Sequence, residues 1–287
     1  MSVESVKNEI GNMKDVLSIM DRVNEVFSYE VWVPSLKRNV MFREINTSQQ
    51  KRLIKAIIDS PVYNTEFIFA LRSVIQENCV ETLDIDNLTI LDKLLIAMKM
   101  RSISVGDSLE IKIPTGEKDK FIKRAISLEN LISQLKNDIT IPDPETFIDE
   151  REIYTLECGI PTIINEYKLE SELRHTTESR DIKNYDDLRQ SVGDVFIGEV
   201  AKYVHGLSIK EDDKITKLDL NVLSFRNRIA LLEKLPERIT KNVINYIEKT
   251  KKELNKITLV KVNIGTDEIP EIKEEKFAID GSFFTSS

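Results

Sequence analysis

The side chains best suited to catalysis or metal binding are sparse in this sequence. It holds two histidines, His175 and His205, and two cysteines, Cys79 and Cys158, in 287 residues. None of the four stands in a close ligand pattern such as His-Glu-x-x-His or Cys-x-x-Cys. A cysteine near the end of a helix is more often a buried, inert thiol than a reactive one. The sequence therefore predicts no metal site and no redox pair.

Two carboxylates, Asp84 and Asp86, precede a predicted helix. A metal site would use such a pair, but the positive end of the helix dipole attracts acidic residues to helix starts. We interpret both as capping residues.

Motifs for catalysis and for cofactor binding are also lacking. No Gly-x-x-x-x-Gly-Lys phosphate loop, Gly-x-Ser-x-Gly elbow or Gly-x-Gly-x-x-Gly turn occurs in the sequence. We therefore expect a protein that is not an enzyme, with no catalytic residue, no cofactor and no small-molecule substrate. An enzyme whose site is assembled from distant carboxylates is the minority alternative.

The composition is that of an ordinary globular protein with a sizeable core. Apolar residues make up 41% of the chain and charged residues 31%, and the net charge is −8. A negative chain is repelled by nucleic acid and by anionic membranes, so we expect neither as a partner. The start of the chain lacks the plan of a signal peptide, and no apolar run approaches the ~18 residues of a membrane helix. A cytoplasmic protein is expected.

Hydrophobic patterning divides the chain into four parts. Residues 1–28 form an amphipathic helix, and residues 29–140 form a core module that opens with a β-hairpin near 29–45. Residues 145–265 form a second helical module with strands, and residues 266–287 form an acidic linker and an aromatic tail. The boundary between the modules is placed at Ile141-Pro142-Asp143-Pro144, since prolines interrupt regular structure there.

Within the core module, a helix is expected to begin at Thr47. Gln50 follows three residues later, which predicts a capping box between these two side chains.

The fold class expected from this pattern is α+β and predominantly helical. A helical body would carry the small hairpin and a few further strands.

The first candidate partner-binding surface is the amino-terminal helix. Its apolar residues step alternately by three and four, as in a heptad seam with one polar position. The seam consists of Val3, Val6, Ile10, Met13, Leu17, Met20, Asn24 and Phe27. A buried asparagine in such a seam would specify the register and oligomer state of paired copies. Packing of this helix against its own domain is the alternative.

The second candidate surface is the carboxyl-terminal tail. Four apolar residues, Phe277, Ile279, Phe283 and Phe284, follow the acidic segment 267–276. Such a tail suits docking into a groove of a partner. The alternative is that it folds back and completes the local core, and the sequence leaves both open.

Several short motifs follow one another along most of the chain. They are Val31-Trp32-Val33-Pro34-Ser35, Val40-Met41-Phe42-Arg43, Thr47-Ser48-Gln49-Gln50-Lys51, Asn78-Cys79, Asp92 before Leu94-Leu95, Arg101-Ser102-Ile103-Ser104-Val105-Gly106-Asp107, Gly159-Ile160-Pro161-Thr162, Leu235-Pro236 and Asp280-Gly281-Ser282-Phe283-Phe284. In this order they resemble the baseplate hub and hub-assembly proteins of T-even-like contractile-tail bacteriophages.

The resemblance implies a structural component of the baseplate hub, or a chaperone of hub assembly that is absent from the virion. Its partners would be other hub or tail proteins and its own copies. It would be found in the host cytoplasm during assembly and, as a structural subunit, in the tail baseplate. The amino-terminal helix is longer than the family pattern requires, which suggests an added oligomerisation or partner-binding element.

Overall fold

The computed structural model of the protein describes residues 13–16, 18–20, 27–59, 65–114, 120–179, 185–212, 214–265 and 271–285. Residues 13–16 and 18–20 are helical. The later α-helices are α2 (Thr47–Asp59), α3 (Thr65–Asn78), α4 (Ile90–Ser104), α5 (Leu128–Asp138), α6 (Ile163–Ser179), α7 (Tyr185–Tyr203), α8 (Phe225–Leu232) and α9 (Glu237–Thr258). Short 3-10 turns are η1 (Pro34–Leu36), η2 (Ile85–Asn87), η3 (Leu220–Val222) and η4 (Gly281–Phe284).

The strands form small antiparallel sheets. They are β1 (Ser28–Val33), β2 (Arg38–Arg43), β3 (Ser108–Pro114), β4 (Phe121–Ser127), β5 (Glu145–Ile148), β6 (Tyr154–Cys158), β7 (Val204–Glu211), β8 (Lys214–Asp219), β9 (Leu259–Asn263) and β10 (Ile272–Lys276). Strands β1 and β2, β3 and β4, and β9 and β10 pair as two-stranded ribbons, while β5, β6, β7 and β8 form a four-stranded sheet in that order.

The expectation of a predominantly helical fold is wrong, because the described residues form a mixed α+β fold with ten strands in four small sheets. Among the strands that the sequence did not reveal, β8 and β10 are short and charged. The second half of the acidic segment 267–276, expected to be a linker, is strand β10, in which Glu274 pairs in register with Lys261 of β9. Ribbons with solvated faces tolerate charged residues at alternate positions, so apolar periodicity does not mark them.

The first hydrophobic core lies between the β1–β2 hairpin and the helices α2 to α5. Val33, Val40 and Phe42 of the hairpin are fully buried against it. The hairpin pairs Val33 with Arg38 across the turn η1, in which Lys37 adopts a left-handed conformation with φ of 52°. This part of the fold contains the expected hairpin and the expected helix from Thr47, because each buries one regular apolar face.

Helix α2 begins at Thr47 as expected, but its reciprocal cap lies one residue earlier. Asn46 Oδ1 accepts a hydrogen bond from the Gln49 N–H at 2.9 Å, and Gln49 Oε1 accepts one from the Asn46 N–H at 3.0 Å. The predicted capping box of Thr47 and Gln50 is therefore wrong. Asparagine outranks threonine as a cap, and the Gln50 amide donates instead to the Phe284 carbonyl at 2.7 Å.

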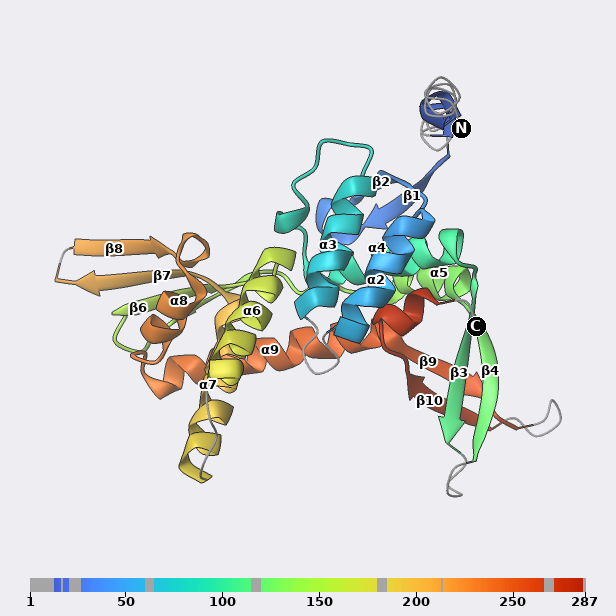
Figure 1. Cartoon of the computed structure of the whole chain (residues 1–287). Helices are drawn as coiled ribbons and strands as arrows, with labels where there is room; N and C mark the ends of the chain where they lie inside the picture. The colour runs from blue at the N-terminus through green and yellow to red at the C-terminus, as the bar shows by residue number, and fades with distance from the viewer. Residues whose placement is uncertain are drawn as a thin grey trace.

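The second core lies between the four-stranded sheet and the helices α7, α8 and α9. Helix α9 connects it to the first core, and 22 residues make this helix about 33 Å long. Its first half buries Ile239, Val243 and Tyr246 in the second core, whereas Ile257 near its end belongs to the first. Figure 1 shows the four-stranded sheet at one end of α9 and the ribbons β3–β4 and β9–β10 at the other, with α2, α3 and α4 between them.

The chain after α9 returns to the amino-terminal half of the fold. A small apolar cluster joins Ile111 and Ile113 of β3 to Val260 and Val262 of β9. The first core lies mostly before residues 141–144, but it also contains Ile163, Ile257, Phe283 and Phe284 from beyond them. Sequence order and spatial order therefore diverge in this part of the fold.

Candidate partner-binding surfaces

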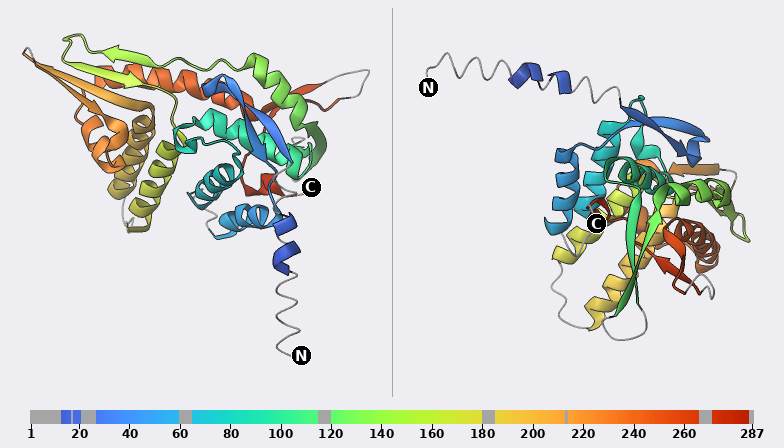
Figure 2. Two further views of the ribbon diagram at one scale, coloured as in Figure 1. Left: turned by 90° about the horizontal axis from the view of Figure 1, so that it is seen from above. Right: turned by 90° about the vertical axis from the view of Figure 1, so that its right-hand side faces the viewer.

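The described part of the amino-terminal helix is uncovered by the rest of the chain. Met13 is 64% exposed, Met20 53% and Phe27 60%, and Val16 and Ile19 between them are also more than half exposed. Both views in Figure 2 show this helical piece set apart from the body. Of the other predicted seam residues, Val3, Val6, Ile10, Leu17 and Asn24 lie outside the described residues.

The carboxyl-terminal tail is not a free docking element. Phe283 and Phe284 are buried in the first core, and Phe277 and Ile279 are half-buried against it. The Phe284 ring lies 6.4 Å from Phe67, and Phe283 stacks on Phe277 at 5.9 Å between centroids. The assignment of these tail residues to partner binding is corrected accordingly. The tail completes the core because that core has an apolar opening into which the two aromatic rings fit.

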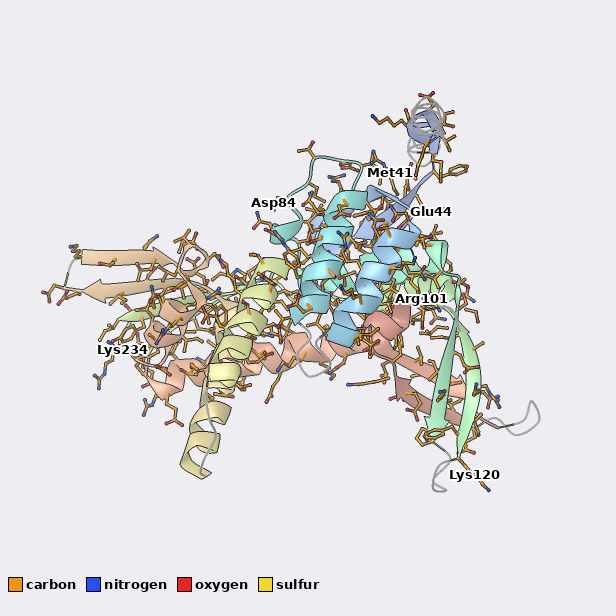
Figure 3. All side chains as sticks on the ribbon, viewed as in Figure 1. Met41, Glu44, Asp84, Arg101, Lys120 and Lys234 are labelled. Carbon is orange, nitrogen blue, oxygen red and sulfur yellow. The ribbon has the colours of Figure 1, made fainter. Side chains whose placement is uncertain are left out.

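Arg101 holds the tail in place from inside the core. Its side chain is 1% exposed, its Nε donates to the Phe283 carbonyl at 2.8 Å, and its Nη2 donates to the Ser108 carbonyl at 3.1 Å. A third hydrogen bond runs from Nη1 to the Gly106 carbonyl. In Figure 3 Arg101 lies at the centre of the molecule beside the carboxyl-terminal segment. One guanidinium thus joins α4, the turn before β3 and the tail.

Asp92 also links separate segments through hydrogen bonds, at the amino-terminal end of α4. Its Oδ1 accepts the Ser35 N–H of turn η1 at 3.0 Å, and its Oδ2 accepts the Thr89 N–H at 2.8 Å and the Thr89 hydroxyl at 2.6 Å. Ser35, Asp92, Arg101 and Phe283 come from separate motifs of the phage-protein resemblance. Those motifs therefore meet in one core, where their polar groups serve folding.

Of the histidines and cysteines singled out in the sequence, Cys158 is buried, whereas Cys79 and His205 are partly buried. Burial raises the pKa of Cys158 to about 12, so its thiol is protonated at neutral pH and is a poor nucleophile. Burial also raises the pKa of Cys79, whose Sγ donates to the Glu81 carbonyl at 3.4 Å. His205 and Cys158 lie on neighbouring strands but make no metal-ligand group, and none of three or more ligands occurs within the described residues. The His175 side chain lies outside the described residues, although its backbone is part of α6.

The two acidic residues before α4, Asp84 and Asp86, have different roles. Asp84 caps turn η2 by accepting the Asp86 N–H at 3.1 Å, and Asp86 forms an ion pair with Arg72 of α3. Capping therefore describes Asp84, whereas Asp86 is a cross-link between elements.

His205 makes the second core sensitive to acid. Burial and the charge of Arg228 on α8 lower the pKa of His205 to about 4, against the smaller opposing effects of the Gly159 backbone and Asp219 on β8. The unfolded histidine, with a pKa of about 6.5, binds a proton more readily. The stability due to neutral His205 is therefore complete above pH 6.5 and is lost as the pH falls towards 4, at up to about 1.4 kcal/mol per unit.

Urea unfolding of the wild type and of His205→Gln between pH 7 and pH 4.5 tests this expectation. The difference in unfolding free energy between the two proteins should shrink steadily below pH 6.5. Glu170, whose pKa burial raises, contributes equally to both and cancels. Parallel pH profiles would contradict this expectation, because they would show that folding leaves the pKa of His205 near its unfolded value.

A groove separates the hairpin side of the first core from the four-stranded sheet. Its volume is about 820 Å³, and we call it the Trp32 groove. One wall is formed by Trp32, the turn η1, α4 and α5. The rest of the lining is formed by residues 139–144, the end of β6 with the residues after it, and His205 of β7. The His205 Nε2 atom is buried without a hydrogen-bond partner among the described residues.

The groove begins where two strands separate. Pairing of β5 with β6 ends at Glu145 and Cys158, and beyond that pair the two backbones form parts of the groove wall. Sequence reasoning missed this site, because its walls come from distant segments. The available signals were the single tryptophan and the Ile-Pro-Asp-Pro run, which was interpreted as a joint only.

Among the helices that the structure describes, none combines the length and the apolar character needed to cross a bilayer. Comparison of the chain with protein-family models, with curated proteins and with solved structures finds no match. The function therefore has to be argued from the residues and their geometry.

Proposed function

We propose that this protein is a structural component of the central hub of a contractile-tail phage baseplate and acts through protein–protein contacts. The observation that carries the proposal is the exposed apolar face of the helical residues 13–16 and 18–20. Met13, Val16 and Met20 lie at spacings of three and four residues and so share one helical face. Leaving this face in water costs free energy that association with another helix recovers. A permanent assembly supplies such a partner.

The arrangement of the body supports the same proposal. The motifs that resemble those of hub proteins build the first core through Asp92 and Arg101, so the likeness extends to residues that determine the fold. From this body the amino-terminal helix, the ribbons and the four-stranded sheet extend in different directions (Figure 1). Exposed apolar side chains occur on each of these extensions, namely Met20, Phe121, Ile215 and Ile272. Such a shape suits a subunit that contacts several neighbours.

An assembly chaperone of the hub, absent from the finished particle, is the second candidate. The Trp32 groove favours it, since a groove with mixed polar and apolar walls suits a contact that forms and is later released.

Quantitative mass spectrometry of complete contractile tails and of baseplate intermediates, from the organism that carries this chain, tests the two candidates. A hub subunit is expected in finished particles at a copy number matching three-fold or six-fold symmetry. A chaperone is expected in intermediates only. Absence from both would refute the proposal and reopen the question of an enzyme.

A further inference from the structure

We propose that the Trp32 groove binds an extended segment of a partner protein, aliphatic with one acidic side chain, alongside residues 139–144. This inference rests on the proposed function, because it names the site through which the chain would hold a partner. Three features of the groove carry it: an open backbone edge, an elongated apolar floor and unpaired lysines on one wall.

The backbone edge is preorganised for a strand. Ile141 and Asp143 each precede a proline, which restricts both to extended conformations. Within the described residues, their N–H groups donate no hydrogen bond, whereas the Ile139 N–H donates to Leu135 at 2.9 Å and the Thr140 N–H to Glu253 at 3.4 Å. N–H donors at alternate residues of an extended run match the spacing with which a peptide adds to a sheet edge.

The floor of the Trp32 groove is too long to be filled by a compact ligand. A second hollow, of about 200 Å³, shares Trp32, Leu95 and Lys136 with the groove. Trp32, Leu95 and Lys136 therefore border both hollows. An extended chain rises about 3.3 Å per residue, so a segment of several residues is needed to cover both hollows.

The charges of the walls define the partner's chemistry. Lys37 and Lys136 make no ion pair with any residue that the structure describes, and the Lys136 Nζ lies 5.1 Å from the centre of the Trp32 ring. The chain has a net charge of −8, so two lysines without an ion pair on one wall form a local positive patch on a negative protein. They attract a carboxylate. Asp143 and Glu157 also line the groove and repel further acidic residues, which limits the segment to one acid near the lysines.

The test uses three pools of synthetic peptides of about ten residues, a length typical of strand addition. All have varied aliphatic residues at alternate positions and differ at the centre or in the backbone. The first pool has a central aspartate, the second a central lysine, and the third the aspartate with N-methylated alternate amides. Trp32 is the sole tryptophan of the chain, so its fluorescence reports occupancy of the groove. Anisotropy of fluorescein-labelled peptides gives a second, independent reading.

The aspartate pool is expected to give a saturable change in Trp32 fluorescence, and the other two pools should bind at least about tenfold more weakly. Lys136→Glu should reverse the preference between aspartate and lysine. Lys217→Glu is the matched control, because Lys217 is exposed on β8 and lies outside the groove. It should leave all affinities unchanged.

The inference is overturned if no pool binds, if the three pools bind equally, or if Lys136→Glu behaves like Lys217→Glu. Equal binding of the N-methylated pool alone would remove the strand-like contact and leave a side-chain pocket, which also contradicts the proposal. If the peptides fail to bind but the protein is present in finished particles, only the inference about the groove is refuted. If the peptides bind but the protein is absent from particles and intermediates, the proposed role in the hub is refuted and the inference about the groove stands.

Discussion

Truncation of the chain after Lys276 is expected to unfold the first core. The deletion removes Phe283 and Phe284, which are 2% and 0% exposed, together with the half-buried Phe277 and Ile279. Removing one buried phenylalanine side chain costs about 3 to 5 kcal/mol, and a whole domain is stable by only about 5 to 15 kcal/mol. The free energy lost with two such side chains and their neighbours therefore approaches or exceeds the whole stability of the domain.

Circular dichroism and limited proteolysis of the purified protein measure this outcome. Protease cleavage should appear within α2 to α4, whose core the tail completes. Phe284→Ala gives a graded version, with an expected loss of about 3 kcal/mol or more in urea unfolding. Phe121→Ala is the control, since this ring is 57% exposed and should change stability by less than about 0.5 kcal/mol. A truncated chain that kept full stability but lost its partners would restore the docking role of the tail.

Replacement of Arg101 by leucine is expected to cost about 3 kcal/mol of unfolding free energy or more. The substitution leaves the Phe283 carbonyl without its donor inside the core and the Gly106 and Ser108 carbonyls without theirs at its partly exposed edge. Each unsatisfied buried acceptor costs about 1 to 3 kcal/mol. Part of this is offset, because burial lowers the pKa of Arg101 and relief of the buried charge is favourable.

Arg226→Leu is the matched control for this substitution. Arg226 is exposed on α8, so the same chemical change should alter stability by less than about 0.5 kcal/mol. Arg101→Lys should fall between the two, because one ammonium group cannot reproduce the planar fork that reaches three carbonyls. Equal urea midpoints for Arg101→Leu and Arg226→Leu would show that the tail is held by its aromatic rings alone.

The elements with regular apolar periodicity were predictable from the sequence. The β1–β2 hairpin follows from alternating spacing, and the start of α2 at Thr47 was expected. The start of α4 was not, because Thr89 caps it and Asp84 caps turn η2 instead. Capping was predictable in kind but not in detail. The box at α2 uses Asn46 and Gln49, one residue before the predicted pair.

The charged strands were not predictable in the same way. Strand β8 has a sequence of Lys, Ile, Thr, Lys, Leu and Asp and is almost wholly exposed, and β10 is dominated by charge. Their stability comes from hydrogen bonds to β7 and β9, partners that no local pattern reveals. For this reason the helical content was overstated in the expected fold class.

The candidate surfaces also depend partly on local sequence and partly on tertiary contacts. The sequence by itself determined that residues 13–20 carry a regular apolar face, because spacing along one helix is a local property. Only the tertiary structure decided that this face is uncovered while the equally apolar tail is buried, since burial depends on what other segments leave open. It alone joined Trp32, Lys136, His205 and residues 139–144 around one groove. Segments that lie far apart in the chain become neighbours only when the cores pack. The spacing of residues along the sequence does not predict such long-range contacts.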